Sequence, residues 1–177
     1  MKKILKSKTM ALLIVSVLSL TICLSGCGSS GDSNGTNGGN TPKVAGETQT
    51  WGNLTVLVPE GMKLVGGDLL DENNQDALII QANDDPLKFV SISIKDEETI
   101  DMGLEMTREM NTDCPITDIT DLKLANGTFT GFSYVSYDIT CVQLKGDLGG
   151  KFLQVGSNNF ESNDEVFQGI IGSVVAK

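Results

Sequence analysis

The sequence predicts an α+β domain in which an antiparallel sheet of about six or seven strands, arranged in hairpins, is covered by two helices. Short alternating stretches of apolar and polar residues are separated by turns rich in Asn, Asp, Gly and Pro, a pattern typical of hairpins. Two longer stretches change to the helical period of apolar residues. About 130 residues follow the leader and linker described below, which is enough for one domain with its own core.

The first three predicted strands are short and end at recognisable turns. They cover residues 51–59, 77–81 and 87–94. The turn Pro59-Glu60-Gly61-Met62 follows the first strand, and Asn83-Asp84-Asp85-Pro86 joins the other two. Because Asn, Asp and Pro favour tight turns, we predict that these two strands form a hairpin.

A helix is predicted over residues 99–110, preceded by acidic residues that favour a helix N-terminus. Met102, Met106 and Met110 recur at i, i+4 and i+8, with Ile100 and Leu104 beside them. A methionine stripe can pack in a core, or it can form an adaptable binding surface. We expect core packing here.

The second half of the domain repeats the hairpin pattern and closes with a helix. Further strands are predicted at 119–125, 128–137, 139–144 and 151–155. Asn126-Gly127 stands between the first two of these and is the strongest short hairpin signal. The segment Ser162-Asn163-Asp164-Glu165 predicts the cap of a helix that continues to Val174.

The N-terminal segment, residues 1–26, predicts a secretory signal peptide. Four lysines lie within the first eight residues, and residues 10–24 are apolar apart from Ser and Thr. A retained membrane helix needs about 20 apolar residues, so the shorter run favours a cleaved signal.

The end of this segment, Leu24-Ser25-Gly26-Cys27, resembles the lipobox of bacterial lipoproteins. The resemblance implies that Cys27 receives diacylglycerol, that cleavage precedes it, and that its lipid chains hold the protein on the extracytoplasmic face of the cell membrane. Two or more chains give stable anchoring. The long simple linker and the low aromatic content favour a Gram-positive membrane over an outer membrane.

A flexible tether is predicted after the anchor, over residues 27–48. It is composed mostly of Gly, Ser, Asn and Thr, which cannot bury enough apolar surface to offset the entropy of ordering. Residues 49–177 then form the acidic α+β domain. From residue 27 onward there are nine basic and 23 acidic residues, a net charge of −14. This charge disfavours nucleic acid as a partner, because phosphate binding requires clustered Lys and Arg.

Histidine is absent from the sequence. Its absence excludes Ser-His-Asp and Cys-His catalysis and the commonest zinc ligand. Cys114 and Cys141 could join in a disulfide that closes a loop of about 27 residues and adds about 3 kcal/mol, or they could remain reduced. Both alternatives are open from the sequence.

An acidic stretch offers the only metal-binding candidates. Asp68, Asp71, Glu72 and Asp76 supply the oxygen ligands that Ca²⁺ prefers. Their spacing does not match the calcium loop of EF-hands, so a solvated loop is the favoured interpretation. No cofactor is expected.

Two segments resemble a known family. Leu57-Val58-Pro59-Glu60-Gly61-Met62 and the closing run from Phe167 to Val174 resemble the PsbP-like α/β/α sandwich lipoproteins of Firmicutes, with the resemblance covering residues 49–177. It implies an accessory role in binding other proteins, and it carries no catalytic residue.

The predicted function is therefore that of a non-enzymatic, membrane-anchored binding or accessory module for another envelope protein. Exposed aromatic side chains are common anchors of protein interfaces, so Trp51, Tyr134 and Tyr137 are the predicted partner-binding residues. The alternative is a calcium- or small-ligand-binding surface module. A carboxylate-based hydrolase is a weaker third alternative, because chance pairs of acids are expected among so many.

Overall fold

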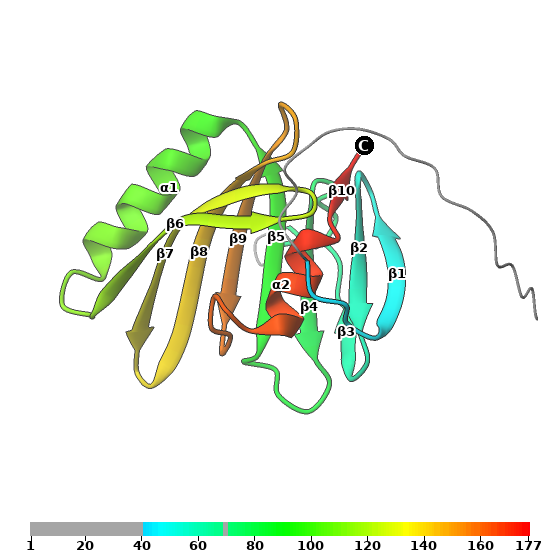
Figure 1. Ribbon diagram of the computed structural model, residues 1–177, viewed down its shortest axis with the longest axis horizontal. Coiled ribbons are helices and arrows are strands. Elements are labelled where there is room, and N and C mark those ends of the chain that lie inside the picture. The colour runs from blue at the N-terminus through cyan, green and yellow to red at the C-terminus, as the bar shows by residue number, and fades with distance from the viewer. Residues whose placement is uncertain (1–40, 69–70) are drawn as a thin grey trace, which may run out of the picture. The chain divides into compact units, whose positions relative to one another are not determined.

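The computed structural model describes residues 41–68 and 71–177, which form two antiparallel sheets and two helices (Figure 1). The predicted signal peptide, the lipobox residues 24–26, Cys27 and most of the tether lie outside the described residues. Within the described ranges, no helix is both long enough and apolar enough to span a bilayer.

The larger sheet has seven strands in the order β3-β4-β5-β9-β8-β7-β6, and all neighbours are antiparallel. Its strands are β3 (Met62–Leu64), β4 (Ala77–Ala82), β5 (Phe89–Lys95), β6 (Ile116–Leu124), β7 (Gly127–Ser136), β8 (Ile139–Asp147) and β9 (Phe152–Asn158). The predicted fold class is confirmed by this sheet and its two helices. The predicted hairpins β4–β5 and β6–β7 are also present, the latter with Asn126 in its turn.

A second sheet, which the sequence pattern does not distinguish from the first, has three strands in the order β1-β2-β10. These strands are β1 (Gly46–Trp51), β2 (Leu54–Pro59) and β10 (Val175–Ala176). β2 is the central strand and alternates as predicted, with Leu54, Val56 and Val58 buried. It packs its buried side chains into the same core as the larger sheet.

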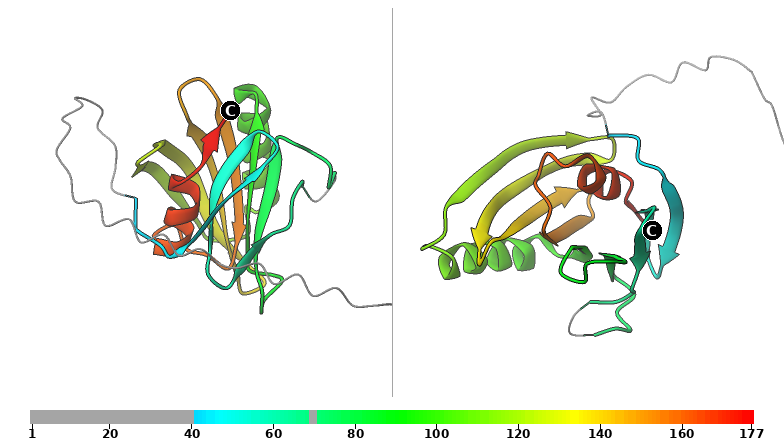
Figure 2. Two further views of the ribbon diagram at one scale, coloured as in Figure 1. Left: turned by 90° about the vertical axis from the view of Figure 1, so that its right-hand side faces the viewer. Right: turned by 90° about the horizontal axis from the view of Figure 1, so that it is seen from below.

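The two helices lie on opposite faces of the larger sheet (Figure 2). α1 (Glu97–Met110) begins after Asp96, whose carboxylate accepts a hydrogen bond from the Thr99 backbone N–H at 2.8 Å. α2 (Glu165–Gly172) begins after Asp164, whose side chain accepts from two backbone N–H groups of the first turn. Both caps satisfy donors that have no partner within the helix.

The hydrophobic core lies between the α2 face of the larger sheet, β2 and α2. Its largest fully buried side chains include Phe129, Phe160, Phe167, Leu78 and Leu153. The same face of β5, β9 and β8 contributes alternate residues, while the intervening residues face α1. The apolar surface of the sheet is therefore directed mainly to α2 and β2, and the α1 face is largely polar.

The end of the predicted tether is structured. β1 begins at Gly46, inside the segment predicted as flexible to residue 48. Ahead of it, Thr41 accepts a hydrogen bond from the Ala125 N–H at 2.8 Å. Thr41 and Val44 pack on the two glycines of α2, Gly172 and Gly169. Composition did not predict this docking, because it depends on glycines more than 120 residues further along the chain.

Candidate functional site

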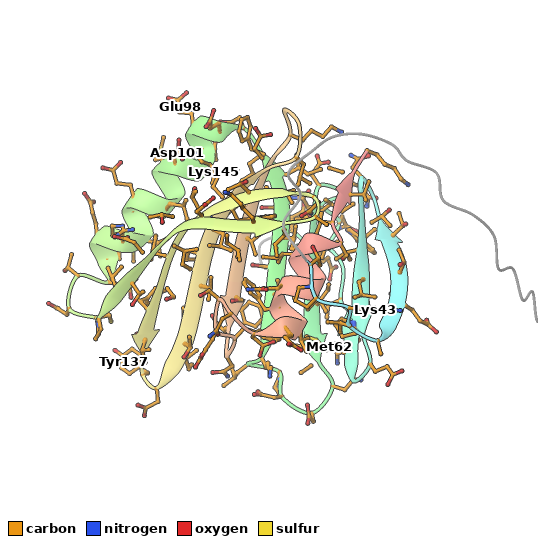
Figure 3. All side chains as sticks on the ribbon, in the orientation of Figure 1. Lys43, Met62, Glu98, Asp101, Tyr137 and Lys145 are labelled. Atoms are coloured by element: carbon orange, nitrogen blue, oxygen red, sulfur yellow. The ribbon has the colours of Figure 1, made fainter. Side chains whose placement is uncertain are left out.

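Helix α1 is held on the larger sheet mainly by polar contacts. Ile100 is its one fully buried side chain. Lys145 of β8 lies between two α1 carboxylates, with its Nζ 2.6 Å from Asp101 Oδ1 and 3.2 Å from Glu97 Oε1 (Figure 3). The hydrogen bond to Asp101, followed by that to Glu97, raises the pKa of Lys145 above its ordinary value. The amine therefore stays charged and ties the first turns of α1 to the sheet.

A second polar contact holds the other end of α1. Arg108 Nη2 is 2.6 Å from Asp118 Oδ1 of β6, and the guanidinium lies 4.4 Å from the centre of the Phe132 ring. Arginine over an aromatic ring combines charge attraction with packing. Together with Lys145, this contact fixes which face of α1 is turned toward solvent.

The outward face of α1 carries the three methionines. Met102, Met106 and Met110 are 64%, 58% and 77% exposed. The expectation that they pack in the core is wrong. The residues beside them in the sequence, Ile100 and Leu104, occupy the inward positions, and residues four apart stay on one side of the helix.

Met110, at the end of the methionine stripe, lies beside the turn between β7 and β8. Met110, Val135 and Tyr137 line one hollow of about 390 Å³, together with the segment between α1 and β6. Tyr137 is 97% exposed and projects from the turn (Figure 3). We call Met102, Met106, Met110 and Tyr137 the Met–Tyr surface. Apolar side chains exposed together, rather than singly, mark interaction sites.

Acidic residues border the Met–Tyr surface. Glu98, Glu105 and Glu109 are exposed and lie three or four residues from Met102 or Met106, so they form a row beside the methionines. Figure 3 shows Glu98 pointing away from the sheet. The site therefore combines an adaptable apolar ridge with negative charge.

The predicted aromatic residues do not form one surface. Tyr137 is exposed as expected, but Tyr134 is partly buried, and burial followed by the nearby Cys141 raises its pKa to about 12. Trp51 is also partly buried, and its indole N–H donates to the Asn74 carbonyl at 2.9 Å. β1, which ends at Trp51, and the β7–β8 turn lie at opposite ends of the domain (Figures 1 and 2).

Cys114 and Cys141 are free thiols in the structure. Cys141 is buried in β8, and its thiol donates to Asn158 Oδ1 at 3.4 Å. Burial raises the pKa of the Cys141 thiol, and a hydrogen bond with Tyr134 only partly offsets this. The thiolate is the reactive form, so this environment suits a structural cysteine rather than a nucleophile.

Two of the predicted calcium ligands are engaged in hydrogen bonds within the protein. Asp68 accepts from the Asp71 N–H at 2.6 Å and from the Asn74 side chain at 3.1 Å. Asp76 accepts from the Asn53 side chain at 2.7 Å, and Glu72 is exposed. Among the described residues, no three Asp, Glu, Cys or His side chains are grouped to hold a metal ion.

The described fold defines an α+β domain with a seven-stranded antiparallel sheet, a three-stranded sheet and two helices. No protein-family model matches the chain, and no curated protein is similar to it. A crystal structure of a protein from Bacteroides thetaiotaomicron VPI-5482 aligns with 75% of this chain at 9% identity and a TM-score of 0.40. The chain spans 48% of that protein's length.

The Met–Tyr surface was missed from the sequence because its period is the same as that of a core-facing stripe. Neighbouring carboxylates do not separate the two faces either. Ile100 and Leu104 have Glu97 and Asp101 three residues before them, just as Met102 and Met106 have Glu105 and Glu109 three residues after them.

Proposed function

We propose that this chain is a membrane-anchored extracytoplasmic lipoprotein, held through lipid on Cys27, whose domain is a non-enzymatic accessory module for another envelope protein. The observation that carries the proposal is the exposed Met–Tyr surface, whose methionines are each more than half exposed. Methionine side chains are unbranched and polarizable, so they adapt to a partner's surface. An accessory role also agrees with the resemblance to PsbP-like lipoproteins.

The partner segment that fits this surface is an amphipathic helix with Lys or Arg beside its apolar face. The row of Glu98, Glu105 and Glu109 would attract the basic residues, while Met102, Met106 and Met110 would take the apolar ones. The net charge of −14 from residue 27 onward also increases the rate of encounter with a basic partner at low salt.

Site-specific photo-cross-linking in intact cells tests the docking site. A photo-reactive amino acid at Met106 should capture one envelope protein through a basic amphipathic segment. The same group at Leu87, an apolar residue of similar exposure in the β4–β5 turn, is the matched control. Identical products from both positions, or contact through an acidic segment of the partner, would refute the proposed site.

Binding measurements test the chemistry of the interaction. A synthetic peptide of the captured segment should bind the full chain at least tenfold more weakly after Met102, Met106 and Met110 are changed to Ser. Glu105→Lys should also weaken binding, and more so at low salt, because exposed charges are screened by added ions. Leu87→Ser should leave the affinity unchanged. Membrane fractionation of Cys27→Ser tests the anchor separately, since loss of the lipid should release the chain.

A further inference from the structure

A second surface lies on the other side of α1, on the polar face of the larger sheet. A groove of about 330 Å³ has β5, β9 and β8 as its floor. Its lining combines polar side chains with apolar residues; the polar ones include Ser91, Ser93, Lys95, Gln143 and Gln154, and the apolar ones are Ala77, Leu78 and Ile92. The groove shares no lining residue with the hollow beside Tyr137.

Strand register places these polar side chains in two rows. Ser91 pairs with Gly156, which pairs with Gln143, and Ser93 pairs with Gln154. Because side chains alternate across a strand, both rows point to the α1 face. The intervening residues of the same strands, such as Val90, Ile92 and Val155, are buried in the core on the opposite face.

Gly156 creates the hollow at the centre of the floor. A Cβ at this position would lie 2.9 Å from Ser91 Oγ and 3.4 Å from Gln143 Nε2. Any larger residue would therefore fill the space between the serine and the amide. The Ser91 hydroxyl donates to the Gly156 carbonyl at 3.1 Å, which sets its orientation at the edge of this space.

Gln154 lines the groove and lies next to α1. Lys95 Nζ donates to Gln154 Oε1 at 2.8 Å, which fixes the orientation of the carboxamide. The Gln154 Nε2 then faces Gly103 of α1, where an added Cβ would lie 3.4 Å away. An oriented amide beside a glycine can present its second N–H to a ligand without moving a neighbouring side chain.

We propose that this groove binds a small, neutral, polyhydroxylated ligand of the saccharide class. Carboxamides and hydroxyls each offer both donors and acceptors, as sugar hydroxyls do. Lys95 is already engaged by Gln154, and Asp68 at the rim by its own loop, so the lining is suited to a neutral ligand rather than an ion. The volume is at the lower end for ligand pockets, about 300–1,000 Å³, which limits the ligand to a small size.

The test is a titration of the full chain, isotopically labelled and kept in a sugar-free detergent, with glucose, N-acetylglucosamine and cellobiose. The side-chain amide NMR signals of Gln143 and Gln154 are the readout. We expect saturable shifts of these two signals, and at least a tenfold loss of affinity in Gln143→Leu and Gly156→Ala. Ser93→Ala removes only one hydroxyl from the lining and should weaken binding less. It provides a test that does not depend on correct folding of the other two variants.

Controls separate the groove from other surfaces. Gln49→Leu, on an exposed position of β1, and Met106→Ser, on the Met–Tyr surface, should both retain saccharide binding. Absence of saturable shifts with all three sugars in the folded wild-type chain would overturn the proposal. Stronger binding of glycylglycine or glucose 6-phosphate than of glucose would overturn the neutral ligand class.

Discussion

Residues 41–45 pack on α2, and the contact between Val44 and Gly169 should set the sign of the stability change caused by Gly169→Ala. Gly169 lies inside α2, where replacing glycine by alanine normally stabilises a helix by about 1 kcal/mol. A Cβ on Gly169, however, would lie 2.5 Å from Val44 Cγ2 and 3.1 Å from Val44 Cβ. Overpacking of this kind costs about 1–3 kcal/mol. We therefore expect Gly169→Ala to lower the free energy of unfolding by about 1 kcal/mol.

The Val44→Ala background should reverse the sign. It removes the Cγ2 atom that would overlap, and leaves the 3.1 Å approach to Cβ and an ordinary contact with the Pro42 carbonyl at 3.5 Å. In that background we expect Gly169→Ala to raise the free energy of unfolding by about 0.5 kcal/mol, because the helix propensity then dominates. The coupling between the two substitutions should be about 1.5 kcal/mol, within the range for residues in contact.

Urea unfolding measures these changes, with fluorescence of Trp51, the single tryptophan, and far-UV circular dichroism as two probes. Gly103→Ala is the matched control, since it also lies inside a helix but its Cβ would meet only Gln154 Nε2 at 3.4 Å. That variant should gain stability. If Gly169→Ala gains as much as Gly103→Ala, or if Val44→Ala leaves its effect unchanged, residues 41–45 do not pack on α2 as described.

Three further substitutions test other contacts. Asn126→Ala should lower the free energy of unfolding by about 2–3 kcal/mol in urea, because its side-chain amide donates to two carbonyls at the end of α2 at 2.8 and 3.0 Å; a loss under 0.5 kcal/mol would contradict this role. Gly146→Ala should cost about 1–3 kcal/mol by the same assay, since its Cβ would overlap the buried Phe129 ring. Lys145→Met should cost about 0.5–1 kcal/mol at pH 7, because its carboxylate partners, such as Asp101, are half exposed. The pKa of Lys145 is raised in the folded state, so its charged amine contributes stability fully below the unfolded pKa of about 10.4. This contribution is lost as the pH rises through the folded pKa. The stability difference between the wild-type chain and Lys145→Met should therefore disappear above the folded pKa.

The proposed binding surfaces lie on two sides of α1. The outward face of the helix carries the methionines, and Gly103 lies next to Gln154, which lines the polar groove. The ion pairs of Lys145 and Arg108 hold the helix on the larger sheet, so that it lies between the two surfaces. A change that loosens α1 should therefore affect both binding activities, whereas Met106→Ser and Gln143→Leu should each affect one.

Local patterns were sufficient to predict most secondary structure. Alternation at Leu54, Val56 and Val58 placed a strand, and Asn126-Gly127 placed the β6–β7 turn, because each signal depends only on residues close in the chain. The acidic and polar segments that contain Asp96 and Asp164 also predicted helix starts, because a helix cap depends on neighbouring residues. The apolar leader and Leu24-Ser25-Gly26-Cys27 likewise predict a lipoprotein from contiguous residues alone, a prediction that concerns positions outside the described structure.

Contacts between distant segments set which of the predicted faces are buried and which residues meet. The sequence pattern predicts a helix with a methionine stripe, but only packing on β8 and β9 placed Ile100 inward and the methionines in solvent. It also determined polar residues on β5, β8 and β9, but strand order placed Ser91, Gly156 and Gln143 in one row. The physical reason is that helical and strand periods specify relative positions along one element, whereas burial and juxtaposition depend on contacts between distant segments.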